Sequence, residues 1–375
     1  MSPHGYTRRW FTPFVFSAPL WRAAVAEGQT PRDVSIADFG AVGDDAKVNT
    51  KAIQAAIDHA AGSGGGTVTV PRGVFVSGAL FLKPKVNLHL EKDAVLKCST
   101  DMANFPVQRT RIEGHFEEKF NPALINAKNC DGLRISGEGT LDGAGRPIWD
   151  LFWKLRAAAP NPGNFPNVGV PRARMALIES SRGVTIEGIT FKDSQFWNLH
   201  LYRCQDVTVR QARFEVPDDY RQAPSTDGVD LDSCQDVTVD GCYFSVTDDC
   251  IAAKGSKGPH AAEDKDSPPV ERIRVRNITL DSAGGTIVSV RPWSQYVDLK
   301  GEAPPNSVVR NLSMVGIQGR FGAFGAVQPN PGQTEISDVS FKDFDVTLDK
   351  DQLATSGVSR LSFENVKVNG KLMSQ

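Results

Sequence analysis

Two short segments in the middle of the chain concentrate aspartates. The first is Thr226–Asp232, which carries Asp227, and the second is Thr247–Cys250, which carries Asp248. Asp227 and Asp248 are 21 residues apart, a spacing that fits one circuit of a coil and would stack the two carboxylates. Carboxylates a few ångströms apart repel each other when both are ionised, so at least one pKa should rise. A general acid would then lie beside a general base, the pair that hydrolysis of a glycosidic bond requires.

The local pattern leaves alternatives open. In a strictly alternating strand either Asp248 or Asp249 would point inward, so a corner or bulge must intervene if both are to reach one cleft. Gly228 could provide such a bulge for the pair Asp227 and Asp230. Aspartates are also common at corners, where they cap turns through their own backbone, and in calcium-binding loops. From spacing alone, catalysis and corner capping remain alternatives.

Internal repetition is the strongest structural signal in the sequence. Val184–Phe191 aligns residue by residue with Val207–Phe214, Val237–Phe244 and Ile273–Leu280. Weaker copies begin near Leu133, Val309, Val339 and Leu361. Each copy holds two short alternating strands joined by a polar or glycine corner. This alternation predicts an inner set, Val184, Ile186, Ile189 and Phe191, and an outer set, Thr185 and Thr190.

Units this short cannot bury a core alone, but coils stacked at ~4.8 Å per step bury one continuous apolar column. We therefore predict an all-β protein with a right-handed parallel β-helix. A β-sandwich, the alternative, does not repeat its strands in a fixed frame. No long helical segment is expected between strands, and one helix is predicted over Thr50–Ala61, where it would cap the N-terminal end of the core.

The spacing of the repeats grows through insertions. The extra residues are Pro217–Ser225 and Gly255–Pro269. We expect the two insertions to lie at a common corner and to form a wall on one flank of the solenoid, where binding surfaces usually form. The strands between them, which carry the aspartates, are then the place for chemistry.

The N-terminal segment differs from the rest of the chain. Residues 1–26 contain the pair Arg8 and Arg9, an apolar stretch from Trp10 to Trp21 and a small-residue end at Ala24–Ala26. This pattern predicts a signal peptide, and the paired arginines suggest the twin-arginine route; a disordered terminus is the alternative. The stretch is too short to span a bilayer, so no membrane association is expected and the protein should be secreted or periplasmic.

Composition excludes other classes of function. The 375 residues carry a net charge of −2, which argues against nucleic acid as a partner because phosphate binding needs a clustered cationic surface. Three of the six cysteines, Cys130, Cys204 and Cys234, occupy the same place in the repeat, which predicts a stacked ladder of small buried side chains. No CxxC pair is present, and no metal or cofactor is expected. Residues 27–375 are predicted to form a single catalytic domain that is a monomer.

Several motifs resemble those of one enzyme family. Ala37–Asp44, the predicted helix with Gly64–Val68, and Asn87–Leu90 are similar to the N-terminal signature of glycoside hydrolase family 28, the polygalacturonase family. Ser225–Gly228 resembles the Asn-Thr-Asp-Gly motif of that family, and Asp248–Ala252 resembles its Asp-Asp-Cys-Ile-Ala motif. The likeness runs from residue 34 into the 280s, and the fold that it implies is the pectin-lyase-like β-helix.

The resemblance implies an inverting hydrolase whose partner is an acidic plant-type polysaccharide or its oligosaccharides. Asp248 would match the general acid that protonates the leaving oxygen, and Asp227 and Asp249 would match the carboxylates that activate water. Inversion typically separates the two carboxyl groups by roughly 6.5–9.5 Å, which leaves room for that water. Asp230, in the first motif, is expected to support these groups or to contact substrate.

The sequence also departs from the family pattern. A Gly-His-Gly motif follows the paired aspartates in polygalacturonases, whereas the corresponding stretch here, Ser282–Thr286, has no histidine, and the later Arg-Ile-Lys motif is not evident. Rhamnogalacturonan hydrolases of the family have Gly-Gly at this point but usually vary the paired aspartates, which are intact here. The sequence therefore lies between the two subtypes, galacturonan and rhamnogalacturonan.

Other residues are candidates for substrate contact. An arginine can bind a uronate through two hydrogen bonds and a tryptophan can stack on a sugar ring. The substrate-binding candidates are Arg291, Trp293, Arg320, His200 and Lys254. A surface position is the alternative for the two arginines, a packed or corner histidine for His200, and a solvated side chain for Lys254.

Three other functions remain open on the sequence. A polysaccharide lyase of the same fold would need calcium and a basic residue, and no matching Arg or Lys is obvious. A non-catalytic glycan-binding β-helix would bind without turnover, against which the intact three aspartates argue. A hydrolase with exo action could arise if the insertions block one end of the cleft.

Overall fold

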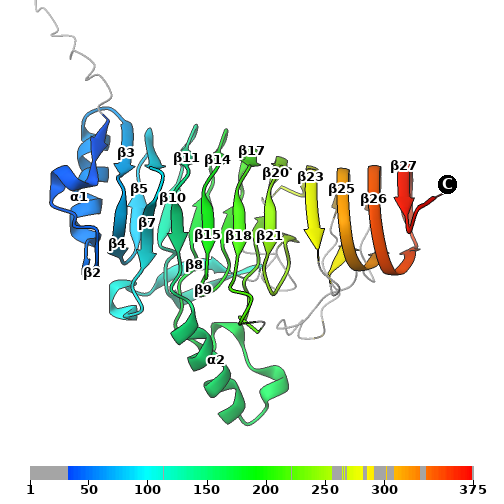
Figure 1. Cartoon of the computed structure of the whole chain (residues 1–375), viewed down its shortest axis with the longest axis horizontal. Coiled ribbons are helices and arrows are strands. Elements are labelled where there is room, and N and C mark those ends of the chain that lie inside the picture. Colours follow the sequence, from blue (N-terminus) through cyan, green and yellow to red (C-terminus); the bar gives the residue numbers. More distant parts are fainter. Residues whose placement is uncertain are drawn as a thin grey trace, which may run out of the picture.

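The computed structural model describes residues 33–373 except 113, 221, 256–263, 265, 267, 282–284, 291–300, 302–307 and 330–334. The chain winds into coils that stack side by side along the long axis of the molecule, with helix α1 (Thr50–Gly62) at one end and the C-terminus at the other (Figure 1). This is the predicted parallel β-helix.

Three parallel sheets form the sides of the helix, and the chain visits them in the order A, B, C. Sheet A holds β1 (Val34–Ser35), β3 (Gly66–Val70), β6 (Val86–Leu90), β11 (Arg134–Gly137), β14 (Thr185–Glu187), β17 (Gln205–Arg210), β20 (Gln235–Asp240), β23 (Val270–Asp281), β25 (Val308–Val327), β26 (Glu335–Thr355), β27 (Val358–Val368) and the antiparallel β28 (Lys371–Leu372), with β24 (Thr286–Val290) paired to β25. Sheet B holds β2 (Asp44–Val48), β4 (Gly73–Ser77), β7 (Ala94–Cys98), β12 (Thr140–Asp142), β15 (Thr190–Lys192), β18 (Arg213–Glu215) and β21 (Tyr243–Ser245). Sheet C holds β5 (Leu80–Leu82), β10 (Ile125–Lys128), β13 (Ala176–Glu179), β16 (Leu199–Tyr202), β19 (Val229–Asp232) and β22 (Ile251–Lys254).

The repeat frame read from the sequence is the register of sheet A. Ile186 pairs with Val209, Val209 with Val239 and Val239 with Val275. The inner set predicted for the first copy, Val184, Ile186, Ile189 and Phe191, is fully buried, and Thr185 and Thr190 are partly exposed. One weak copy is displaced: Leu312 pairs with Ile273, so that copy begins at Leu312 rather than near Val309.

Aromatic side chains stack along the inside of sheet B. The rings of Phe191 and Phe214 are 4.7 Å apart between centroids and those of Phe214 and Phe244 are 5.0 Å apart, with interplanar angles of 12° and 6°. Stacked rings at this spacing match the coil repeat, so each coil adds one aromatic layer to the core.

Helix α1 confirms the predicted cap. It begins at Thr50, and it buries Ile53, Ala56, Ile57 and Ala60 against the first coils. The apolar stripe closes the open end of the core, which would otherwise present unpaired strand edges.

Between strands, the expectation of no further helix was wrong. Helix α2 (Arg146–Ala158) lies between β12 and β13 and projects from the side of the solenoid (Figure 1). Its buried residues, Ile148, Trp149 and Phe152, follow the i, i+1, i+4 spacing of one helix face, whereas Leu151 and Leu155 are exposed. Short 3-10 helices that lie wholly within the described residues are η1 (Ile36–Phe39), η2 (Met102–Asn104), η3 (Pro162–Asn164) and η4 (Asn167–Gly169).

The predicted insertions do not share a corner. Residues 217–225 come between a strand of sheet B and a strand of sheet C. Residues 255–269, most of which lie outside the described residues, come between a strand of sheet C and a strand of sheet A, so the two insertions belong to different corners. Two further insertions share the B-to-C corner with 217–225: α2 and the antiparallel hairpin of β8 (Gln108–Ile112) and β9 (His115–Phe120). The wall that the sequence predicted is therefore built from more segments than expected.

The cysteine ladder is confirmed. All six cysteines are free thiols. Cys130, Cys204 and Cys234 are buried; Cys204 and Cys234 are on neighbouring coils, and Ser181 occupies the equivalent position on the coil between Cys130 and Cys204. The Sγ atoms of Cys204 and Cys234 each donate to a backbone carbonyl at 3.3 Å. In the part of the chain that the structure describes, no helix is long and apolar enough to cross a membrane.

Candidate active site

Three aspartates meet where the chain enters sheet C. Asp227 immediately precedes β19, and Asp248 and Asp249 immediately precede β22, the next strand of that sheet. One carboxylate oxygen of each residue lies within 4.8 Å of the other two. The sequence therefore identified three residues that the fold does bring together.

An extra residue in the later coil makes this convergence possible. Thr226 lies beside Thr247, with their hydroxyl oxygens 2.9 Å apart, whereas Val229 pairs with Ile251. The later coil thus holds one more residue between these points, and both of its aspartates can face Asp227. The irregularity lies at Asp248–Asp249 and not at Gly228, where the sequence suggested a bulge.

Gly228 has a different role, which is close packing. A Cβ atom at this position would lie 2.5 Å from the carbonyl oxygen of Cys250 and 2.7 Å from the ring of Phe244. The preceding loop is fixed by Asn198, whose amide donates to the carbonyl oxygens of Thr226 at 3.3 Å and Asp227 at 3.1 Å. Buried packing and hydrogen bonds therefore determine where the Asp227 carboxylate lies.

The environment gives the aspartates unusual acidities. The surrounding protein, which limits solvation of the carboxyl group, and the charges of Asp227 and Asp249 raise the pKa of Asp248 to about 7. The pKa of Asp249 is also raised, by the same limited solvation and by Asp227. Asp248 can therefore hold a proton near neutral pH although its side chain opens to solvent.

Asp230 and Lys254 lie beside this cluster. Asp230 is fully buried, and burial raises its pKa well above the ordinary value, against the effect of Lys254. The Nζ atom of Lys254 lies 3.0 Å from Asp230 and 3.2 Å from Asp227. Lys254 is thus ion-paired and largely buried, so the alternative of a solvated lysine is wrong.

His200 does not line the cleft, in contrast to its place among the substrate-binding candidates. Its side chain is fully buried, its Nδ1 accepts a hydrogen bond from Arg174 at 2.7 Å, and its Nε2 lies 3.6 Å from Asp232. Burial lowers the pKa of His200 to about 4, so the imidazole is neutral. The packed histidine is the alternative that the geometry supports.

A buried ionic network beside the aspartates was not predicted from the sequence. Arg111, on the hairpin strand β8, donates to both carboxylate oxygens of Asp232 at 2.8 and 3.1 Å, and both side chains are fully buried. Burial opposes ionisation of Asp232, but the nearby His200 ring and the two hydrogen bonds from Arg111 outweigh it and hold the pKa of Asp232 well below its usual range. In the sequence, the alternation that places Asp230 and Asp232 on one face of β19 was the feature that could have indicated a role for Asp232. No feature of the sequence indicated a role for Arg111.

Of the three remaining candidates, the structure describes Arg320. Arg320 lies on β25, is exposed, and forms an ion pair with Asp349 at 3.6 Å. Arg291 and Trp293 lie outside the described residues, as do residues 282–284 of the stretch that replaces Gly-His-Gly.

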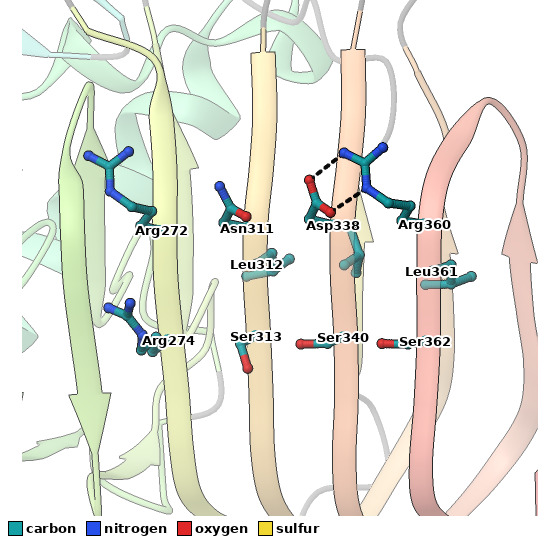
Figure 2. A pocket seen from close by; sticks show the side chains of 11 residues that line it. Arg272, Arg274, Asn311, Leu312, Ser313, Asp338, Ser340, Arg360, Leu361 and Ser362 are labelled. Atoms are coloured by element: carbon teal, nitrogen blue, oxygen red, sulfur yellow. Dashed lines mark hydrogen bonds and ion pairs between the residues drawn. The ribbon is translucent and has the colours of Figure 1, made fainter.

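A shallow hollow lies on the outer face of sheet A. It is floored by a row of serines, Ser313, Ser340 and Ser362, and bordered by arginines (Figure 2). The Arg360 side chain there donates to both oxygens of Asp338 at 2.6 and 2.7 Å. The hollow is on a different sheet from the aspartates and does not extend their site.

The three-aspartate cluster could act in either of two ways. Its oxygens are spaced so that one water molecule could bridge two of them at ~2.8 Å each. Carboxylate oxygens are also the ligands that calcium prefers, so the donor set does not by itself exclude a cation.

Comparisons with known proteins agree on one family. The model for "Glycosyl hydrolases family 28" matches residues 67–285. A probable polygalacturonase of Vitis vinifera is 28% identical over 273 residues, which cover 68% of this chain and 50% of the relative. An exopolygalacturonase of Zea mays is 25% identical over 268 residues, which cover 71% of this chain and 56% of the relative. The chain thus spans about half the length of these curated relatives.

The crystal structure of a hyperthermoactive exopolygalacturonase from Thermotoga maritima has the same fold. Its TM-score is 0.65 at 20% sequence identity, with 91% of this chain and 93% of that chain covered.

Proposed function

Because the chain belongs to glycosyl hydrolases family 28, we propose that it hydrolyses glycosidic bonds in a pectic polysaccharide of the galacturonan or rhamnogalacturonan type. The observation that carries this proposal is the convergence of three carboxylates within 4.8 Å, one of them with a pKa of about 7. A carboxyl group that keeps a proton beside carboxylates that accept one is what acid–base hydrolysis needs.

In the proposed reaction Asp248 is the general acid. Its proton goes to the glycosidic oxygen as the bond from that oxygen to the anomeric carbon breaks. A water held between Asp227 and Asp249 attacks the anomeric carbon and gives its proton to one of these carboxylates. The proton returns to Asp248 through solvent, so the site is restored.

The stereochemical outcome is proposed to be inversion, which the family resemblance implies. The nearest oxygens of the three aspartates lie within 4.8 Å, closer than the roughly 6.5–9.5 Å typical of inverting pairs. Proton NMR of the first sugar released decides the matter: inversion yields the anomer opposite to the cleaved linkage, and retention would assign one aspartate as a nucleophile.

The experiment that tests the activity is product analysis. The protein is incubated with polygalacturonan and separately with rhamnogalacturonan, each with and without a calcium chelator. Saturated oligosaccharides formed despite the chelator support the hydrolase, and the preferred polymer identifies the subtype. Unsaturated products that disappear with the chelator would instead indicate a lyase, and no product from either polymer would contradict the proposal and favour a binding role.

Two variants make the assay specific. Asp248→Asn should abolish hydrolysis without altering the fold, because the change is isosteric and its side chain opens to solvent. Asp345→Asn, the same change at an exposed position on β26, is the matched control and should retain full activity.

Export is part of the proposal. Residues 1–26 would be removed as a signal peptide, which leaves residues 27–375 as a monomeric, secreted or periplasmic catalytic domain. N-terminal sequencing of the exported protein, together with its mass in solution, tests these statements.

A further inference from the structure

Lys254 forms ion pairs with two aspartates of the site. Its Nζ atom lies 3.2 Å from Asp227 and 3.0 Å from the buried Asp230. The cation therefore lies directly beside the carboxylate of Asp227, one of the three candidate catalytic groups.

The position of the lysine is fixed by packing. Lys254 stands next to Asp232 in the register of sheet C and Asp230 stands next to Ala252, so the lysine side chain runs back past Ala252 to reach the aspartates. Its Nζ atom lies 4.3 Å from the centroid of the Trp197 ring, a cation–π contact. Only 13% of the side chain is exposed, so solvent screens its charge weakly.

We propose that Lys254 is a positioning residue that gives the three aspartates unequal roles: it holds the negative charge on Asp227 and leaves the proton of the cluster on Asp248. This inference rests on the proposed hydrolytic function. It also replaces the expectation that Lys254 binds the substrate directly.

The charged surroundings are consistent with this role. Several titratable or charged groups face the lysine and its partners. They come from β16, from β19 and from the segments before β13, β19 and β22, and they are Asp227, Asp230, Asp232, Asp248, Asp249, His200 and Arg174. The charge of Lys254 opposes the rise in pKa of both Asp248 and Asp249. Without this charge, the pKa values of Asp248 and Asp249 would both be higher.

The test is the pH dependence of kcat/KM on the preferred polymer for Lys254→Met and Lys254→Arg. Lys254→Met should lower kcat and move both limbs of the profile upward by roughly 0.5–1 pH unit, the effect of removing one nearby charge. Lys254→Arg should keep the limbs in place because it keeps the charge. Lys342→Met, at an exposed lysine paired with Glu364, is the control and should change neither.

Two results would overturn the inference. A loss of activity in Lys254→Met with unshifted limbs would mean a merely structural role. A rise in KM with unchanged kcat and unshifted limbs would mean direct substrate binding.

A second measurement does not depend on activity. Asp248→Asn removes the contribution of Asp248 to the pH dependence of Tm. The difference in Tm between the protein with Asp248 and the protein with Asp248→Asn therefore changes with pH near the pKa of Asp248. In proteins that also carry Lys254→Met, this change in the Tm difference should occur at higher pH. If the wild type hydrolyses neither polymer but this shift occurs, the proposed function fails while the charge distribution stands; an unshifted difference contradicts the charge distribution itself.

Discussion

Replacing Arg111 with methionine should destabilise the protein by about 3–5 kcal/mol, because it leaves a buried carboxylate without its main partner. Arg111 and Asp232 have no exposed side-chain surface and are joined by hydrogen bonds of 2.8 and 3.1 Å. Asp264, 3.3 Å from the same guanidinium, also loses an ion pair. The pair links the hairpin of β8 and β9 to sheet C, so its loss also loosens one wall of the cleft.

The expected change in Tm follows from the size of the chain. An unfolding entropy of about 2.1 cal/mol/K per residue gives about 0.8 kcal/mol/K for 375 residues. A loss of about 3–5 kcal/mol should therefore lower Tm by roughly 4–6 °C. The measurement is thermal unfolding at pH 7, followed by tryptophan fluorescence or calorimetry.

The pH dependence of this loss has a definite sign. The native pKa of Asp232 lies below its ordinary value, so the pair contributes stability above the ordinary aspartate pKa and loses it as the pH falls. In Arg111→Met the buried carboxyl can accept a proton in acid. The difference in Tm between wild type and variant should therefore be larger at pH 7 than near pH 4.

A matched surface pair provides the control. Arg360 and Asp338 on sheet A are also joined by two hydrogen bonds, but their side chains are 68% and 35% exposed (Figure 2). Arg360→Met should cost about 0–1 kcal/mol. The double change Arg111→Met with Asp232→Leu should recover part of the loss, since neither charge of this pair is left buried, although Asp264 still lacks the arginine. Equal effects at Arg111 and Arg360, or no recovery in the double variant, would refute the reasoning.

Three further results are expected. Because Asp248 must be protonated to act, kcat/KM should fall above pH about 7; an alkaline limb far from that value would contradict its assignment as the acid. Since the native pKa of Asp248 lies above its unfolded value, wild-type Tm should lose a contribution as pH rises from 4 to 7, and Asp248→Asn should remove it. Phe214→Ala, which empties the middle of the stack with Phe191 and Phe244, should cost about 3–5 kcal/mol in urea unfolding; Phe214→Leu should cost much less.

The fold could be predicted because apolar side chains recur at fixed positions in each copy of the repeat. Val184, Val207 and Val237 recur in a fixed frame, and a frame of alternating residues has one parallel stacking that buries every copy. Helix α2 could not be predicted in the same way, because it occurs once and belongs to no repeat. Its buried residues Ile148, Trp149 and Phe152 do follow the i, i+1, i+4 spacing of a helix, so a local helical signal was present in the sequence.

The site could be predicted in part for a related reason. Asp227, Asp248 and Asp249 belong to short motifs, and one circuit of the coil places them together. Arg111 lies 121 residues from Asp232 and reaches it from an inserted hairpin, so no local spacing connects them. The extra residue at Asp248–Asp249 is likewise a detail of strand register. The sequence indicated that a bulge or corner was needed near the aspartates but did not give its position.

The stacked thiols make the protein sensitive to the order of folding and oxidation. Cys204 and Cys234 occupy equivalent positions on neighbouring coils, and parallel strands ~4.8 Å apart bring Cα atoms into the range that a disulfide requires. In the folded chain these thiols are buried, and burial raises the pKa of Cys234 well above its usual value, so the reactive thiolate is scarce. A chain that stacks its coils before it meets an oxidant keeps its six thiols. A chain oxidised first would join coils through sulfur before their core had formed, and oxygen exposure during refolding would then decide how much protein recovers its native state.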